Sequence, residues 1–256
     1  MTYTKIEQYK IKKSWQGLSG YILMFGLVLA ATIGFKISVN HEISSYDMVL
    51  VTIGNINNSL VFHFVVSLIS CLSFAGEYAY ETYRYILIRP VSLFKLYISK
   101  FSSIWFYSLK LLIYIAVLSF ISGTIFWGAQ SGVVHGKDHI VLDYGLLRII
   151  LLYIGIWINM LFIIALSILF SVKFKNQATA LIGTMGLLFI SIMATDIMPT
   201  DIMKYTPIGY FSLIPYLNGI NIQWRELISC LLVNTLYCIL ITMISFLYIK
   251  KQDVLV

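Results

Sequence analysis

Residues 76–100 read GEYAYETYRYILIRPVSLFKLYISK and form a polar, basic segment between two apolar runs. The runs cover residues 59–75 and 102–127, and each approaches or exceeds the roughly 20 residues that a helix needs to span a bilayer. A charged side chain at the centre of such a helix costs about 2.5–3.5 kcal/mol. We therefore expect the segment to lie in water, at the membrane surface or against a partner. Its charged residues are Glu77, Glu81, Arg84, Arg89, Lys95 and Lys100.

The composition is that of an integral membrane protein. Hydrophobic residues make up 59% of the 256 residues and charged residues only 11%, and the mean hydropathy is +0.87. A chain of this length has room for about six spans and short loops. No polar stretch is long enough for a separate soluble domain, so we expect one transmembrane domain over residues 1–256.

Six continuous apolar runs predict six membrane helices. Strands of a membrane barrel would instead alternate in polarity over about ten residues. The fold class that follows is an all-α integral membrane protein. The predicted spans are residues 21–35, with Gly20 and Lys36 at the edges, 59–75, a stretch within 102–127, 146–170, 178–198 and 227–249.

The distribution of the 18 Lys and Arg residues predicts the orientation. With a cytoplasmic N-terminus, 13 of them fall inside and 5 outside, which places both termini in the cytoplasm. The net charge of +7 then indicates anchoring on an anionic inner leaflet and needs no nucleic-acid partner. The outer five are Lys36, Lys137, Arg148, Lys204 and Arg225.

Residues 1–19 precede the first span and are basic. Ile11, Trp15, Leu18 and Ile22 share one apolar helical face, which predicts an interfacial elbow helix. A disordered basic leader is the alternative, and a signal peptide would have the same order of basic and apolar parts.

Catalytic and metal-binding patterns are few, and we expect no enzyme activity in this chain. The sequence has no GxxxxGK[ST], HExxH or GxSxG motif and no cysteine pair at metal-ligand spacing. Cys71, Cys230 and Cys238 fall within predicted spans, where cysteine acts as a small hydrophobe. His135 and His139 are four residues apart, but Gly136 between them favours a solvated loop over a metal site.

Ionisable residues at mid-membrane depth are also scarce. His63 lies in the second span and is interpreted as a packing residue, the alternative being a proton relay. Lys110 and Arg148 are close enough to span ends to extend their charges to the surface. This scarcity argues against an ion-driven transporter.

The spacing within the basic segment resembles the cytoplasmic loop of type 2 ABC transporter permeases. Glu77 precedes Pro90 by thirteen residues and Thr82 precedes it by eight, while Ser92 and Lys100 follow it by two and ten. Glu81, Leu93 and Ser99 depart from the family pattern, where glycine, a basic residue and glycine are usual. The resemblance extends over the whole chain with moderate specificity.

This resemblance implies a type V exporter-like fold in the bacterial cytoplasmic membrane. Its parts would be an elbow helix (1–19), six spans, a cytoplasmic coupling helix within 76–100 and an outer re-entrant segment at 199–225. Residues 78–88 lack Gly and Pro and can be helical, and Pro90 ends that helix. The alternative for the loop is a helix that only anchors on headgroups. The implied ATPase-coupling residues are Glu77, Glu81, Thr82, Arg84, Arg89, Pro90 and Lys100.

Pro199, Pro207 and Pro215 divide the outer segment into short pieces. These favour short helices that dip back into the outer leaflet, the alternative being an extracellular cap without a role in gating.

The resemblance also implies partners. ATP and magnesium would bind a separate cytoplasmic ABC ATPase subunit, and this chain would carry no cofactor. A second permease copy is expected, as a homodimer in preference to a heterodimer. Expected substrates are amphipathic peptides, such as antimicrobial or toxin-like ones, or lipid-like molecules. A membrane immunity or sensor protein that binds peptides without transporting them, and an intramembrane enzyme, are the alternatives. Polar residues that could line a path are Ser67, Ser70, Ser73, Ser119, Ser122, Asn159, Ser167, Thr184, Ser191 and Asn234.

Overall fold

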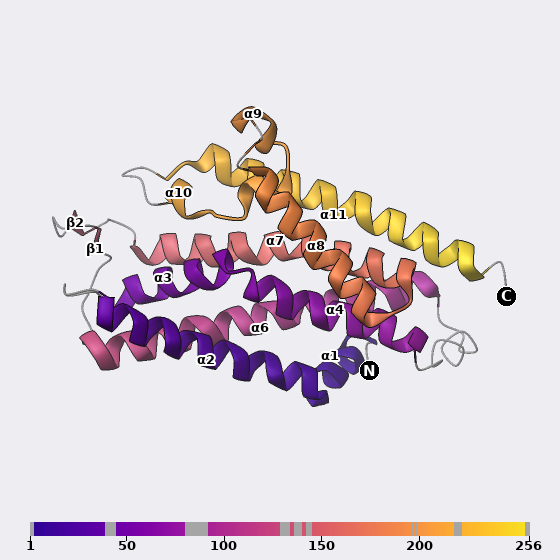
Figure 1. The fold of residues 1–256 in the computed structure, drawn as a ribbon, viewed down its shortest axis with the longest axis horizontal. Coiled ribbons are helices and arrows are strands. Elements are labelled where there is room, and N and C mark those ends of the chain that lie inside the picture. The colour runs from indigo at the N-terminus through magenta and orange to yellow at the C-terminus, as the bar shows by residue number, and fades with distance from the viewer. Residues whose placement is uncertain are drawn as a thin grey trace.

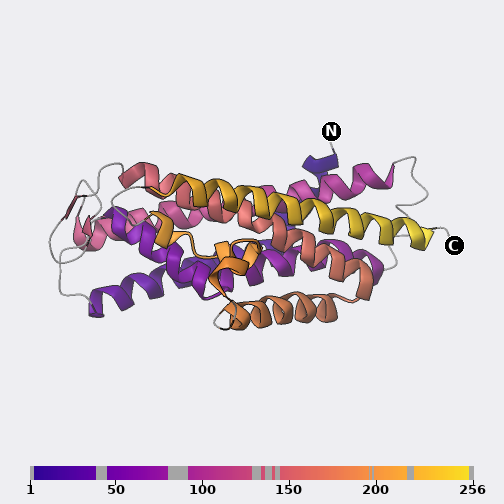
Figure 2. The same ribbon diagram turned by 90° about the horizontal axis from the view of Figure 1, so that it is seen from above.

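A computed structural model describes residues 3–38, 45–79, 92–128, 134–135, 140–141, 145–195, 197, 199–217 and 222–253. Long helices run lengthwise through one elongated bundle (Figures 1 and 2). A two-stranded antiparallel ribbon lies at one end of the bundle, and α11 ends at the other. The helices are α1 (Tyr3–Lys13), α2 (Trp15–Ser38), α3 (Ser45–Asn58), α4 (Val61–Ala79), α6 (Leu93–Trp127), α7 (Gly145–Phe174), α8 (Gln177–Thr195), α9 (Thr200–Met203), the 3-10 turn η1 (Pro207–Tyr210), α10 (Ile214–Leu217) and α11 (Trp224–Asp253), and the strands are β1 (Val134–His135) and β2 (Ile140–Val141).

Within the described residues, five helices are long and apolar enough to cross a membrane, and the number rises to six if the bent pair α3–α4 forms one span. This confirms an all-α protein with five to six candidate spans. Two helix ends differ from the predicted span ends: α6 begins at Leu93 and contains the predicted stretch 102–127, and α8 ends at Thr195 instead of at residue 198. The second predicted span, 59–75, omitted α3.

The α3–α4 pair bends by 58° between Asn58 and Val61. Leu60 adopts a left-handed conformation there, with φ of 59°, which is rare for a branched side chain and interrupts the helical hydrogen bonds. The helix restarts directly afterwards, since the Phe64 amide donates to the Leu60 carbonyl at 2.9 Å. The α3–α4 pair is therefore a helix broken at Leu60.

Helix α7 occupies the centre of the bundle and packs against α4, α6, α8 and α11. Trp105 of α6 and Trp157 of α7 stack with ring centroids 4.1 Å apart, and each indole N–H donates to the other residue's carbonyl. Outward faces of α2 and α11 expose large apolar side chains such as Ile33, Leu232 and Met243. A bundle that is apolar on its outside is suited to lipid.

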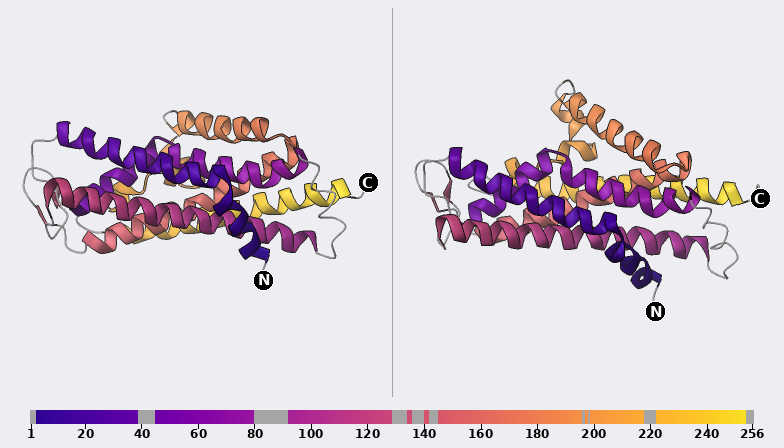
Figure 3. Two further views of the ribbon diagram at one scale, coloured as in Figure 1. Left: turned by 90° about the horizontal axis from the view of Figure 1, so that it is seen from below. Right: turned by 60° about the horizontal axis from the view of Figure 1, so that its bottom comes forward.

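Helix α1 turns away from the axis of α2 (Figure 3). The turn lies at Ser14, whose Oγ accepts a hydrogen bond from the Gly17 amide at 3.0 Å. Because of this turn, the predicted continuous apolar face is divided: Ile11 is buried, whereas Trp15 and Leu18 are exposed. An elbow helix lying on a membrane surface stays a prediction.

Candidate functional site at the base of the basic loop

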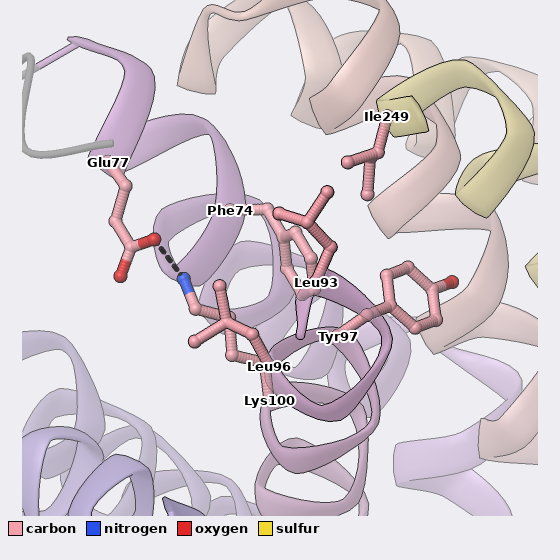
Figure 4. Close-up of a pocket in the computed structure, with 7 residues that line it drawn as sticks. All are labelled: Phe74, Glu77, Leu93, Leu96, Tyr97, Lys100 and Ile249. Carbon is pink, nitrogen blue, oxygen red and sulfur yellow. Dashed lines mark ion pairs between the residues drawn. The ribbon is translucent and has the colours of Figure 1, made fainter. Parts of the chain in front are cut away.

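An ion pair joins the two ends of the basic segment. Glu77, near the end of α4, contacts the ammonium group of Lys100 in the third turn of α6 (Figure 4). The Lys100 side chain is only 2% exposed. Its Nζ also donates to the Ser73 carbonyl at 2.7 Å and lies 5.0 Å from the centroid of the Phe74 ring. These contacts fix both ends of the segment against each other.

Helix α1 joins the same cluster through Lys10. The Lys10 Nζ lies 2.8 Å from Glu7 Oε1 and 3.8 Å from Glu77 Oε1. One turn further along α6 than Lys100, the Ser103 hydroxyl donates to the Thr4 carbonyl at 3.1 Å. The base of the loop therefore connects α1, α4 and α6 through buried and half-buried polar contacts. We call Glu7, Lys10, Glu77 and Lys100 the loop-base cluster.

A small cleft opens beside this cluster. Figure 4 shows the ion pair at one edge and apolar side chains around the rest. Its lining comes from α4, α6 and α11. The lining residues are Phe74, Glu77, Leu93, Leu96, Tyr97, Lys100 and Ile249.

The structure brings together two of the seven predicted coupling residues, Glu77 and Lys100. The other five, Glu81, Thr82, Arg84, Arg89 and Pro90, lie outside the described residues, as does most of the predicted coupling helix at 78–88. His135 is on β1, and His139 lies outside the described part of the chain. Among described residues, no group of three or more His, Cys, Asp or Glu could hold a metal ion.

Sequence reasoning missed a second polar site inside the bundle. Three side chains from α3 and α7 bind backbone carbonyls of the segment that follows α9. Asn57 donates to the Phe211 carbonyl at 2.6 Å and Asn159 to the Tyr210 carbonyl at 2.7 Å. Arg148 donates to the Leu217 carbonyl, so it turns inward and does not extend to the membrane surface as expected. We call Asn57, Asn159 and Arg148 the carbonyl clamp.

The clamped segment is packed deeply. Tyr210, Leu213 and Leu217 are 1–2% exposed, and a Cβ on Gly155 would lie 2.2 Å from Leu213 Cδ1. The glycine therefore permits close approach of this segment to α7. Burial raises the pKa of the Tyr210 phenol, and the nearby Glu226 carboxylate raises this pKa further. The prolines in residues 199–225 predicted these short helices. No pattern in the neighbouring sequence indicates the hydrogen bonds that join them to α3 and α7.

His63 lies beside the clamped segment. Its ring is fully buried and meets Phe211 edge-on, with centroids 4.8 Å apart. Neither ring nitrogen has a hydrogen-bond partner among the described residues. The packing interpretation of His63 agrees with its apolar contacts.

Most of the polar residues that could line a path form hydrogen bonds to backbone carbonyls of their own helices. Ser70 donates to the Val66 carbonyl at 2.8 Å, and Ser167 donates to the Ile163 carbonyl at the same distance. Thr184 donates to the Ala180 carbonyl at 2.6 Å. These hydroxyls are satisfied one turn earlier in the same helix, which favours a role in close helix packing.

The comparisons with known proteins give no activity for the family or for the relative that they match. The chain is similar to "Uncharacterized protein YhcI" of Bacillus subtilis (strain 168), with 23% identity over 189 residues. That alignment covers 70% of this chain and 60% of the relative's length. No solved structure matches. The family model described as "Protein of unknown function (DUF2705)" matches residues 17–255, so the chain belongs to the DUF2705 family.

Proposed function

We propose that this protein is the transmembrane permease subunit of an ATP-driven ABC exporter. The observation that carries the proposal is the contact between Glu77 and Lys100. The sequence singles out both residues by their register relative to Pro90, and their side chains meet at the base of the loop. A spacing that arose by chance would not require the two positions to be in contact.

The loop-base cluster is suited to transmit a movement of the loop to the helices that it joins. Its ion pair holds the ends of α4 and α6 together, and Lys10 adds α1 to the same unit. Force applied to the loop by an ATPase would therefore move these helices as one body. In this proposal Arg84 and Arg89 bind acidic groups or carbonyls of that ATPase, which supplies ATP and magnesium.

The substrate class follows from the helix surfaces that could line a transport path. The interior hydroxyls are largely satisfied within their helices, whereas the outward faces are apolar. We therefore place the substrate path between two permease copies, preferably identical. Such a path is suited to amphipathic peptides or lipid-like molecules.

Affinity purification of the tagged full chain from membranes tests the proposal. The expected result is co-purification of a soluble ATPase that carries phosphate-loop and signature motifs. Arg89→Glu should reduce the recovered ATPase, whereas the control Lys173→Glu, at the end of α7, should not. Recovery of the permease without any ATPase, at wild-type expression, would contradict the proposal. Export of labelled amphipathic peptides from vesicles would then separate transport from binding alone.

A further inference from the structure

The break in the α3–α4 pair interrupts the backbone hydrogen bonds inside the bundle. In a continuous helix the His63 amide would donate to the Ser59 carbonyl, but these two described residues do not form that bond, and His63 is fully buried. The helical bonds resume only with the one from Phe64 to Leu60. A buried amide without its helical acceptor and a leucine in the left-handed conformation both cost free energy. The bend therefore persists because other contacts hold it.

One residue of the clamped segment, Phe211, contacts both arms of the bend. Its carbonyl accepts the hydrogen bond from Asn57 of α3 at 2.6 Å, and its ring meets the His63 ring of α4 with centroids 4.8 Å apart. Residues six apart on a straight helix point about 120° away from each other, so straightening would separate these two contacts. Ile214 also packs on α3, since a Cβ on Gly54 would lie 2.6 Å from Ile214 Cδ1.

The two arms are attached to different parts of the bundle. Helix α3 is joined to the clamped segment, whereas the far end of α4 is fixed at the loop base, where Glu77 and the Ser73 carbonyl contact Lys100. The bend lies between these attachments (Figure 1). A straight helix would regain the missing amide bond and return Leu60 to a right-handed conformation, at the expense of the contacts with Phe211. Each conformation thus has its own set of contacts, as a two-state element requires.

We propose that the α3–α4 pair is a hinge with two conformations. It is bent while Phe211 holds both arms, and it is straight when the clamped segment leaves the bundle. Straightening moves α3 relative to α4, so the hinge links the position of the clamped segment to that of the loop base. The hinge is formed by this chain alone and does not depend on transport or on an ATPase.

Distance measurement by pulsed electron paramagnetic resonance, on the full chain in lipid nanodiscs, tests the hinge. Spin labels at Tyr46→Cys in α3 and Leu72→Cys in α4, on a background without the native cysteines, report the separation of the arms. With a rise of about 1.5 Å per residue, loss of the 58° bend lengthens this distance by about 5 Å. The labelled chain without further changes should give mainly the shorter distance.

Two variants release the arms separately. Asn57→Leu removes the donor to the Phe211 carbonyl and should raise the ratio of straight to bent molecules about fivefold or more. Phe211→Ala removes the ring that meets His63 and should shift the ratio in the same direction. Adding Leu60→Gly to either variant should restore the shorter distance, because glycine adopts the left-handed conformation without strain and disfavours a straight helix. Asn55→Leu, at an exposed position of α3, is the matched control and should change neither distance.

Thiol accessibility of Leu213→Cys, measured in the same variants, reports release of the clamped segment. Release without the longer distance would overturn the hinge, and so would an equal shift in Asn55→Leu and Asn57→Leu. A distance that stays short in Asn57→Leu and Phe211→Ala, with Leu213→Cys still protected, would show that these contacts do not hold the bend and would overturn the proposal as well.

Discussion

Glu77 and Lys100 are 23 residues apart in the sequence and form an ion pair in which the lysine is almost completely buried. A buried charge is retained only if a partner compensates its desolvation. Here the compensation comes from one carboxylate, one backbone carbonyl and one aromatic face. The pair therefore fixes where the basic segment leaves the bundle and where it returns.

Removing only one partner should be more damaging than removing both. Glu77→Ala leaves the Lys100 ammonium buried without its carboxylate, so the free energy of unfolding should fall by about 3 kcal/mol. The double variant Glu77→Ala/Lys100→Met should recover most of that loss. Thermal unfolding can be followed with a thiol-reactive dye, because Cys71, Cys230 and Cys238 are all buried. Lys110→Met, an exposed site on the same helix, should change the free energy of unfolding by less than about 0.5 kcal/mol. Additive losses in the double variant would show that the two residues are not coupled.

The carbonyl clamp should hold the segment of η1 and α10 inside the bundle. Asn159→Leu leaves the buried Tyr210 carbonyl without its donor, at a cost of about 1–3 kcal/mol. A cysteine at Leu213, on a background without the native cysteines, should then become accessible to thiol reagents. Thr235→Leu, at a partly exposed position of α11, is the control. If Leu213→Cys stays protected in the Asn159→Leu variant, the amide does not hold the segment.

Replacing His63 by phenylalanine should maintain or increase stability. The imidazole is fully buried with both nitrogens unpartnered among the described residues, and an apolar ring removes that desolvation cost. The expected gain in the free energy of unfolding is about 1 kcal/mol, measured in the same dye assay. A loss of stability or activity in His63→Phe would show that a polar partner binds the ring in the working protein.

The continuous apolar runs predicted most of the spans because lipid-facing helices are apolar over their whole length. They did not predict α3, because Asp47, Asn55 and Asn57 lower its hydropathy. The Asn57 amide donates its hydrogen bond to the carbonyl of Phe211, more than 150 residues later in the sequence. The start of α6 was missed for the same reason, since the charge of Lys100 is compensated by Glu77 from another helix. The residues of the ion pair were identified by spacing, but their contact and the inward turn of Arg148 depend on tertiary structure.

The orientation can be tested by cysteine labelling on a background free of the native thiols. Because 13 of the 18 basic residues fall on the predicted inner side, Ser131→Cys should react from outside the cell. Asn176→Cys, between α7 and α8, should react only after permeabilisation. A reagent that crosses the membrane, applied to both variants, controls for reactivity. The reverse labelling pattern would overturn the N-in, C-in topology.

ATP hydrolysis by the permease reconstituted with its ATPase in lipid nanodiscs tests the central claim most directly. The account predicts that the complex hydrolyses ATP faster when an amphipathic peptide is added. Arg89→Glu should abolish that stimulation while the permease remains folded and inserted, and Lys173→Glu should preserve it. Equal stimulation of the wild-type and Arg89→Glu complexes would contradict energy coupling through the loop.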